Sequence, residues 1–396
     1  MTKPVELIPA GVGAISRQAE AWRDTLIAWS EINSGSANLA GLDRMGRVLR
    51  DAFAPLADHC ELAPVGDGRR CAVLAHRRRS APLRVLLSGH YDTVYAPDHP
   101  FQACTRLDPD RLRGPGVADM KGGLVVMLAA LRAFEASPAA ENLGWELVIG
   151  PDEEIGSAAT RPRLEEAARG CRIGLVFEPA RQNGDLVGSR KALGSFQIAA
   201  QGLAAHAADL SAPGRNAISA LMDFLLLARA WPEERPGMLF NIGFIRGGGA
   251  ANVVPDFAEA TIDVRVDRAG DVGWVRDRLE SAQAAIAARS GCRFAINGGF
   301  SRPPMEENPA TDRLFSAWRH AALDLGLTPP AKVHSGGGSD ANLIAATGVP
   351  CLDGLGVVGG RLHSADEFVH LPSLVERAQL TALGLHRLAA GEIVLD

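Results

Sequence analysis

Six histidine and carboxylate residues recur along the chain where an apolar, strand-like run has just ended or where glycines make a turn. In chain order they are His90, Asp119, Glu153, Glu154, Glu178 and His363. Imidazole nitrogens and carboxylate oxygens are common ligands of divalent metal ions. When such residues stand at the ends of neighbouring strands, they can converge on a common ion. The pattern therefore predicts a two-metal hydrolase centre.

Asp92 stands two residues after His90. Alternate side chains along a strand point to the same side. Asp92 can therefore accept a hydrogen bond from one ring nitrogen of His90 and leave the other nitrogen for a metal ion. Taken alone, this His-x-Asp sequence is better explained by a hydrogen-bonded histidine in a turn.

Asp119 lies among glycines at positions 114, 116, 122 and 123. Glycines permit backbone conformations that other residues rarely adopt. A carboxylate held in such a turn can bridge two metal ions, with one oxygen on each. The alternative is an N-cap for a helix that begins at Met120, and both roles can hold at once.

Glu153 and Glu154 are adjacent carboxylates, which repel each other unless cations lie nearby. One of the two can bind a metal ion while its neighbour serves as a general base. An exposed acidic turn is the alternative for this pair. An ordinary turn position is the alternative for Glu178 or His363 taken singly.

Charge balance favours the metal centre over these alternatives. Two divalent ions bring four positive charges, which three carboxylates and a bridging hydroxide neutralise. The three carboxylates are those of Asp119, Glu154 and Glu178, and the imidazoles of His90 and His363 then fill one position on each ion. A balanced set of charges has a low solvation cost.

Two other motifs do not fit their usual context. Residues 354–359 match the dinucleotide-binding pattern G-x-G-x-x-G, but residues 360–363 do not begin the helix that this motif requires. Residues 337–341 lack the last glycine of a nucleophile elbow, and no catalytic triad accompanies them. We therefore expect neither dinucleotide binding nor a serine nucleophile.

Composition sets further limits on the class of protein. The 396 residues are enough for two domains, and the net charge of −5 comes from interspersed signs. A nucleic-acid partner is not expected, because the basic run at 77–79 is short and is expected on a solvated turn.

Six cysteines without a C-x-x-C pair predict neither a thiolate zinc site nor a disulfide framework. No signal-peptide core or membrane-length apolar run is present in the sequence, so we expect a cytoplasmic protein with no membrane partner.

The first and last parts of the chain alternate strand and helix patterns, which predicts an α/β layered domain. Apolar runs at 85–87, 146–149 and 173–177 are typical of strands buried on both faces of a mainly parallel sheet. Asn38 is a candidate cap for the second helix. The other expected elements are helices at 14–32, 40–56, 120–135, 311–325, 340–347 and 372–390, and strands at 58–63, 71–76 and 349–353.

The middle of the chain has a different pattern, in the order β-α-β-β-α-β. This order predicts a split βαβ sandwich with one sheet face free. We therefore expect a catalytic domain in two parts, residues 1–188 and 303–396, with an inserted domain at 189–302. The elements of the inserted domain are strands at 193–201, 239–246, 257–266 and 292–297, and helices at 214–230 and 271–289.

These motifs together resemble one family, the co-catalytic dizinc peptidases and deacylases. It includes acetylornithine deacetylase, succinyl-diaminopimelate desuccinylase, aminoacylase and glutamate carboxypeptidase. The resemblance covers nearly the whole chain, and residues 336–341 and 355–366 are most similar to the glutamate carboxypeptidase branch. It implies a zinc-exopeptidase-like three-layer α/β catalytic domain with an inserted ferredoxin-like α+β domain that forms a homodimer.

The resemblance also implies a role for each metal-site residue. His90 and Glu178 would hold one zinc ion, Glu154 and His363 would hold the other, and Asp119 would bridge them. Cobalt or manganese are possible substitutes for the two zinc ions.

A second group of residues would handle the substrate. Glu153 would be the general base, His206 would reach the active site of the partner subunit, and Asn252, Arg265 and Gly338 would bind the substrate.

Departures from the family pattern leave the substrate open. Ala208 stands where a glycine is usual, and residues 190–192 vary between branches. Arg302, where the chain re-enters the catalytic domain, is a further candidate for binding a carboxylate, because a guanidinium matches two oxygens. The alternative for Arg302 is a surface arginine paired with an acid.

The expected reaction is hydrolysis of a small-molecule amide whose amine side is an amino acid with a free carboxylate. Acylated glutamate or aspartate is the first choice of substrate, folate-like or aryl-acyl amides included. N-acetylornithine-like and plain N-acyl amino acids follow. A non-catalytic binding protein on the same fold is the alternative from another class, although such a relative would have lost metal ligands. A one-metal or manganese-dependent relative would offer a cysteine or a further histidine beside Asp119 or Glu154, and the sequence has neither there.

Overall fold

The computed structural model describes residues 8–394, which divide into two compact units. Unit 1 comprises residues up to Ser189, Glu307–His334 and residues from Ser339 onward. Unit 2 comprises Arg190–Glu306 and Ser335–Gly338. The short segment Ser335–Gly338 joins unit 2 although it is distant in sequence from the rest of that unit, a feature that the sequence does not predict.

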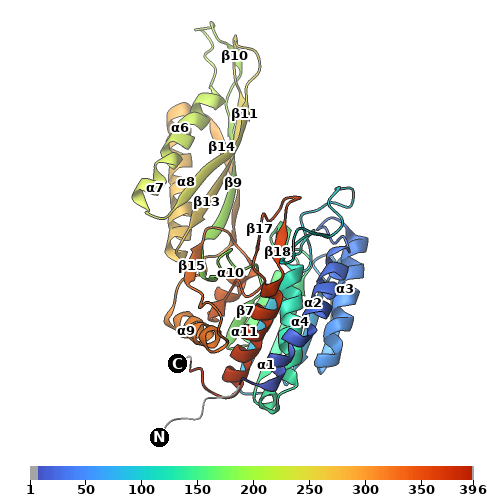
Figure 1. Ribbon diagram of the computed structural model, residues 1–396. Coiled ribbons are helices and arrows are strands. Elements are labelled where there is room, and N and C mark those ends of the chain that lie inside the picture. The colour runs from blue at the N-terminus through green and yellow to red at the C-terminus, as the bar shows by residue number, and fades with distance from the viewer. Residues whose placement is uncertain (1–7, 395–396) are drawn as a thin grey trace. The chain divides into compact units, whose positions relative to one another are not determined.

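Unit 1 is built around a six-stranded mixed sheet (Figure 1). Strands β6, β3, β7 and β16 run parallel, whereas β2 is antiparallel to both β1 and β6. Strands β3 and β6 are buried along almost their whole length, as expected where helices cover both faces. In sheet order the strands are β1 (His59–Val65), β2 (Arg70–Arg77), β6 (Gly144–Gly150), β3 (Arg84–His90), β7 (Ile173–Val176) and β16 (Cys351–Leu352).

The helices of unit 1 pack in two groups. Helices α4 and α11 lie side by side in Figure 1 and pack together, and α1 and α2 also contact α4. Helix α4 is apolar around most of its circumference and buried at nearly every position, as a central helix requires. Helices α5 and α10 contact each other and pack on β6 and β7 respectively. The helices are α1 (Ala10–Ala14), α2 (Ala19–Ser30), α3 (Leu39–Phe53), α4 (Lys121–Glu135), α5 (Arg161–Arg169), α9 (Pro309–Asp324), α10 (Asp340–Ala345) and α11 (Pro372–Ala389).

Short strands complete unit 1, and the sequence does not predict them because two to five residues are too few for a visible alternation. One small antiparallel sheet has the order β17-β18-β5-β4, and β8 pairs with β15. The strands are β4 (Thr105–Arg106), β5 (Arg111–Arg113), β8 (Leu186–Arg190), β15 (Lys332–Ser335), β17 (Gly359–Gly360) and β18 (Phe368–His370). The turn between β17 and β18 carries His363.

Some predictions for unit 1 need correction. The segment expected as one helix at 14–32 is broken by a 3-10 turn at Ser16–Gln18. The N-cap of α4 is Met120, which makes no side-chain capping bond, so Asp119 does not cap this helix. The basic run at 77–79 is not simply a solvated turn, because Arg77 and Arg78 both pair with the buried carboxylate of Glu135. The cap at Asn38 is confirmed, since its side chain accepts from the Gly41 amide.

Unit 2 has a four-stranded antiparallel sheet in the order β11-β13-β9-β14, with α6 and α8 packed against it (Figure 1). Strand β9 alternates buried positions with exposed or half-buried ones, which confirms the expectation of one covered and one open sheet face. The elements are β9 (Ala192–Gln201), β10 (Ala205–His206), α6 (Ala217–Arg229), α7 (Trp231–Glu234), β11 (Leu239–Gly247), β12 (Val253–Val254), β13 (Phe257–Val266), α8 (Ala269–Ser290) and β14 (Arg293–Arg302).

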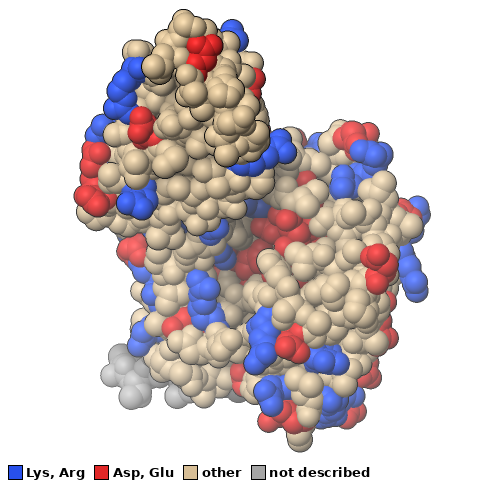
Figure 2. Space-filling view, turned by 90° about the horizontal axis from the view of Figure 1, so that it is seen from above, with Lys and Arg blue, Asp and Glu red and all other residues tan. Residues whose placement is uncertain are grey.

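The structure bears on the expectations drawn from composition for surface charge, membrane-spanning helices and cysteines. Figure 2 shows both acidic and basic side chains on the visible surface, with much of that surface uncharged. Between residues 8 and 394, no helix is both long enough and apolar enough to cross a membrane. All six cysteines are free thiols.

Candidate metal centre

Three parallel strands end at one edge of the unit 1 sheet, and each delivers a candidate ligand there. His90 is the last residue of β3. Glu153 and Glu154 lie in a 3-10 turn that closely follows β6, and Glu178 follows β7 by two residues. Because β3 pairs in parallel with both β6 and β7, the three strand ends lie side by side. Ligands gather at the carboxyl ends of strands in open α/β sheets.

The turn that carries Asp119 reaches the same edge because glycines allow close packing. A Cβ atom at Gly123 would lie 2.0 Å from the carbonyl oxygen of Phe177, so only glycine lets the start of α4 approach the end of β7 this closely. Gly116 has a φ of +70°, in the left-handed region that favours glycine. The result is that Oδ1 of Asp119 lies 3.2 Å from Nε2 of His90.

His363 approaches the opposite oxygen of the same carboxylate. Its Nε2 lies 3.2 Å from Oδ2 of Asp119 and 3.2 Å from Oε2 of Glu154. The backbone of His363 has a φ of +60°, which is uncommon for a residue with a side chain and is found at functional turns. The two oxygens of Asp119 thus face different imidazoles, as a carboxylate that bridges two ions would require.

The donor set fits divalent metal ions. Ligand atoms of His90, Asp119 and Glu154 lie within 4.8 Å of one another, and so do ligand atoms of His90, Glu153 and Glu178. The imidazole of His90 also lies 3.8 Å from the Glu178 carboxylate.

The pKa shifts of the site residues also favour a bound divalent metal ion. Burial raises the pKa of Glu178 well above its ordinary value and also raises the pKa of Glu154. Burial disfavours a charge on His90, but hydrogen bonds to Asp119 and Asp92 outweigh it and raise the pKa of His90. Both kinds of shift mean that the site favours added positive charge, which divalent ions supply.

Asp92 is fully buried and holds several of these groups in place. Its Oδ1 lies 3.3 Å from Nδ1 of His90, which leaves Nε2 directed at Asp119. Its two oxygens also accept hydrogen bonds from the backbone amides of Glu153 at 3.0 Å and Glu154 at 3.2 Å. The sequence suggests the contact with His90, but not that the same carboxylate holds the glutamate pair.

Glu367 is a functional residue that sequence reasoning missed. Its carboxylate is fully buried and accepts hydrogen bonds from the backbone amides of Gly116, Ala118 and Asp119 at 2.9 to 3.0 Å. Tyr95 donates to it at 2.7 Å. Glu367 therefore fixes the turn that presents Asp119. The only sequence signal is an acidic residue close to His363, which by itself does not distinguish it from exposed Asp366.

The residues of unit 2 that the resemblance singled out fall into two groups. His206 and Asn252 form the first group. The Ala207 amide donates to the carbonyl oxygen of Asn252 at 2.9 Å, next to the ladder of β10 and β12. His206 is exposed, and its Nδ1 accepts from the Ala208 amide at 3.2 Å.

Arg265, Arg302 and Gly338 form the second group. Arg265 and Arg302 are both cross-strand partners of Leu193, one on each side of β9. Arg265 pairs with Asp263 at 2.9 Å and donates to the Gly336 carbonyl at 2.9 Å. Arg302 is only 3% exposed, so it is not the surface arginine considered as an alternative. A Cβ atom at Gly338 would lie 2.8 Å from the Arg302 side chain.

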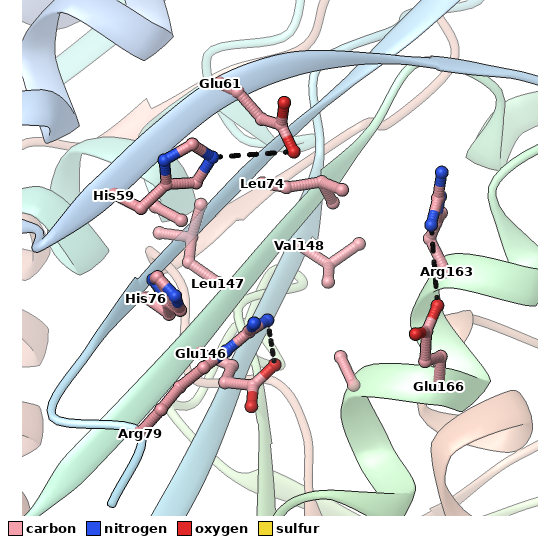
Figure 3. Close-up of a pocket in the computed structure, with 12 residues that line it drawn as sticks. His59, Glu61, Leu74, His76, Arg79, Glu146, Leu147, Val148, Arg163 and Glu166 are labelled. Carbon is pink, nitrogen blue, oxygen red and sulfur yellow. Dashed lines mark hydrogen bonds and ion pairs between the residues drawn. The ribbon is translucent and has the colours of Figure 1, made fainter.

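A separate cavity of about 270 Å³ lies on the sheet of unit 1 beside α5 (Figure 3). Its charged side chains pair with one another, as the dashed lines in Figure 3 mark. The pairs are His59 with Glu61 at 3.6 Å, Arg79 with Glu146 at 3.4 Å and Arg163 with Glu166 at 3.5 Å. None of the candidate site residues lines it, so we do not assign the metal centre there.

Imidazoles and carboxylates gathered at the parallel strand ends of an α/β unit are a donor set that could hold the metal ions of a hydrolase. Residues 86–386 match the family described as Peptidase family M20/M25/M40. The chain therefore belongs to this family of metallopeptidases and related deacylases, as the sequence resemblance predicted.

Individual proteins are also similar to this chain. The chain is 27% identical over 311 residues to carboxypeptidase G2 of Pseudomonas sp. (strain RS-16), covering 78% of this chain and 74% of that protein. It is 31% identical over 366 residues to the succinyl-diaminopimelate desuccinylase of Xylella fastidiosa (strain M23), covering 87% of this chain and 92% of the relative. Among solved structures, the aminopeptidase PepT of Bacillus cereus ATCC 10987 has a similar fold, with a TM-score of 0.76, 20% identity and coverage of 94% and 99% of the two chains.

Proposed function

We propose that this chain is a dinuclear zinc hydrolase that cleaves the amide bond between an acyl group and an amino acid with a free carboxylate. The observation that carries the proposal is the position of Asp119, whose two oxygens face His90 and His363 at 3.2 Å each. A carboxylate shared in this way, with Glu178 near one imidazole and Glu154 near the other, matches a pair of bridged ions.

When bound, two divalent ions would polarise the substrate carbonyl and lower the pKa of a water molecule. Glu153 would accept a proton from the attacking water and return it to the leaving nitrogen. The backbone amide of Glu153 donates to Asp92, and its carboxylate lies within 4.8 Å of ligand atoms of His90 and Glu178, which supports this role. The ligands that would hold the ions are His90, Glu178, Asp119, Glu154 and His363.

The amino-acid part of the substrate is assigned to the arginines of unit 2. A guanidinium binds a carboxylate with two parallel hydrogen bonds. Arg265 is half-buried and held in place by Asp263, so it is pre-oriented. Arg302, Asn252 and Gly338 are further candidates for contact with the substrate.

The first-choice substrate is an acylated glutamate or aspartate, as in a glutamate carboxypeptidase. The name of one relative, carboxypeptidase G2, supports a carboxypeptidase, and the name of the other supports a desuccinylase. A deacylase of the acetylornithine, succinyl-diaminopimelate or aminoacylase type is therefore equally supported. The free thiols are compatible with a reducing compartment, so the cytoplasm is the proposed location.

The homodimer is assigned to unit 2, through β11 and α6. Strand β11 is at the edge of its sheet and exposed along most of its length, so its unpaired backbone groups can pair with a second copy. Its apolar side chains Phe244 and Ile245 are 47% and 54% exposed, and Leu226 on the adjacent α6 is 56% exposed. Exposed apolar clusters of this kind mark protein interfaces.

A hydrolysis panel tests the proposed activity. The zinc-loaded protein is assayed against two series of N-acyl amino acids. The first series varies the amino acid at a constant acyl group, and the second varies the acyl group at a constant amino acid. We expect turnover with at least one acidic amino acid, and loss of turnover after treatment with a chelator. Zinc content by elemental analysis accompanies the assay. A protein with two zinc ions that cleaves no member of the panel would favour the non-catalytic binding protein.

A further inference from the structure

An open pocket of about 510 Å³ borders the metal centre within unit 1, a volume within the range of roughly 300–1,000 Å³ typical of small-molecule sites. Glu154 forms one part of its wall. Val94, Tyr95 and Ile155 make another part apolar, and Val94 and Ile155 are 44% and 58% exposed. Arg70, the first residue of β2, supplies a positive charge.

The guanidinium of Arg70 is only partly satisfied by the protein. One of its terminal nitrogens donates to the carbonyl oxygen of Ser36 at 2.9 Å, and its Nε is buried without a hydrogen-bond partner. Among residues 8–394, no carboxylate lies within ion-pair distance of Arg70. Its neighbour Arg69 differs, because it pairs with Asp67 at 2.6 Å. A half-buried cation without an anionic partner is costly unless a ligand supplies the anion.

We propose that this pocket binds the acyl half of the substrate and that Arg70 selects acyl groups that end in a carboxylate. The inference rests on the proposed function, which assigns the amino-acid half to Arg265. The pocket presents a metal ligand, apolar side chains and a cation. A short dicarboxylic acyl chain presents the matching series of carbonyl, methylene groups and carboxylate.

Glu154 is also anionic and lines the same pocket, so its charge bears on the selection. Its carboxylate lies 3.2 Å from His363 and is assigned to a metal ion, so its negative charge is already compensated. Arg70 has no ion pair of its own: the nearby Asp67 carboxylate, whose pKa is lowered first by hydrogen bonds from Arg69 and only slightly by the charge of Arg70, is paired with Arg69. The net preference of the pocket is therefore for an anionic terminus at the Arg70 side.

The test compares two ligands that differ only at this terminus, N-succinyl-L-glutamate and the analogue whose terminal carboxylate is a primary amide. Binding is measured by calorimetry with zinc-loaded protein that carries Glu153→Gln, which is expected to slow turnover strongly. We expect the carboxylate to bind about 10- to 100-fold more tightly than the amide, as is typical of one charge-assisted hydrogen-bonded pair. Adding Arg70→Gln should remove that preference. The affinity for the amide should stay within about twofold of the affinity measured with Glu153→Gln alone.

Arg69→Gln is the matched control, since it removes the same charge one residue away and should keep the preference. Arg70→Lys keeps the positive charge but lacks the planar guanidinium, so it should retain part of the preference for the carboxylate ligand. This variant replaces Arg70→Gln in the test if Arg70→Gln fails to fold. Equal affinity for the two ligands, or a preference that survives Arg70→Gln, would overturn the proposal. Hydrolysis of both compounds by the unaltered protein is measured in parallel, because loss of hydrolysis with the binding preference intact counts against the proposed function alone.

Discussion

The carboxylate of Glu367 accepts a hydrogen bond from the backbone amide of Asp119 at 3.0 Å, so a residue far along the chain sets the position of the candidate bridging ligand. The same carboxylate also accepts from the amides of Gly116 and Ala118. If Glu367 is replaced by a residue without a carboxylate, these three backbone amides lose the acceptor that they share. The turn that carries Asp119 thus depends on Glu367 for its shape.

Replacing Glu367 with Gln should therefore weaken metal binding. The amide nitrogen of Gln would face backbone donors, and each buried unsatisfied donor costs about 1–3 kcal/mol. We expect zinc affinity to fall about 10- to 100-fold, as when groups that orient metal ligands are removed. Zinc titration against a chelator measures this, with Asp366→Asn, at an exposed neighbouring carboxylate, as the control. Unchanged zinc affinity in Glu367→Gln would show that the turn keeps its shape without this carboxylate.

Replacing Glu153 with Gln should separate catalysis from metal binding. The change keeps the size of the side chain but removes the group that accepts a proton, so we expect kcat to fall about 10²- to 10⁴-fold with zinc content unchanged. Glu154→Gln is the comparison, and it should lose zinc as well as activity. Near-normal turnover by Glu153→Gln would mean that another group is the base.

Zinc affinity should rise with pH. Hydrogen bonds to Asp119 and Glu154 raise the pKa of His363 to about 10 in the metal-free protein. Since this pKa is raised, the imidazole holds its proton through neutral pH and must release it when a metal ion binds. Affinity should therefore increase about tenfold per pH unit for each proton released, and fall as the solution becomes acidic.

Competition with a chelator between about pH 6 and 8 measures this dependence. His363→Ala should weaken zinc binding and flatten the slope, whereas His320→Ala, at an exposed histidine on α9, should do neither. A pH-independent affinity in the unaltered protein would contradict the assignment of His363 as a ligand.

Introducing a charge on the edge strand of unit 2 should disrupt the proposed dimer. Phe244→Glu places a carboxylate on β11 where the side chain is 47% exposed, so the folded monomer should tolerate it. We expect the mass in solution, measured by light scattering, to change from a dimer to a monomer. Leu323→Glu, at a 52% exposed leucine on α9, is the control and should stay dimeric. If both variants and the unaltered protein have the same mass, the dimer interface does not include Phe244.

Mixing two inactive variants tests whether His206 acts on the partner subunit. His206 is exposed beside Asn252, so a second copy of the chain can contact its side chain. In a mixed dimer of His206→Ala and Glu153→Gln chains, one active site receives both intact groups, so part of the activity should return. Heterodimers are verified by differential tagging. If the mixed dimers stay inactive, His206 does not act on the active site of the partner subunit. It then acts within its own chain or has no part in catalysis.

The sequence alone was sufficient for the order of the long strands and of most long helices, and for the candidate ligands. Nearly unbroken apolar runs such as 146–149 are typical of strands buried on both faces, and residues that follow parallel strands lie at one edge of the sheet. Hence His90, Glu154 and Glu178 could be selected as candidate metal ligands before any distance was known, and the family resemblance implied their roles. Alternation of buried and open positions in β9 likewise marked a sheet with one free face.

Only the tertiary structure decided which distant groups support the site. Glu367 contacts Asp119 across 248 residues of chain, and no local periodicity encodes a contact of that separation. The same holds for Arg70, whose place beside Ser36 depends on how the hairpin of β1 and β2 packs, and for Arg302, which looks exposed in sequence but is buried beside Gly338. Local patterns report the conformation of the backbone and the face that is buried, whereas the partner of a polar side chain is chosen by packing between segments that are remote in sequence.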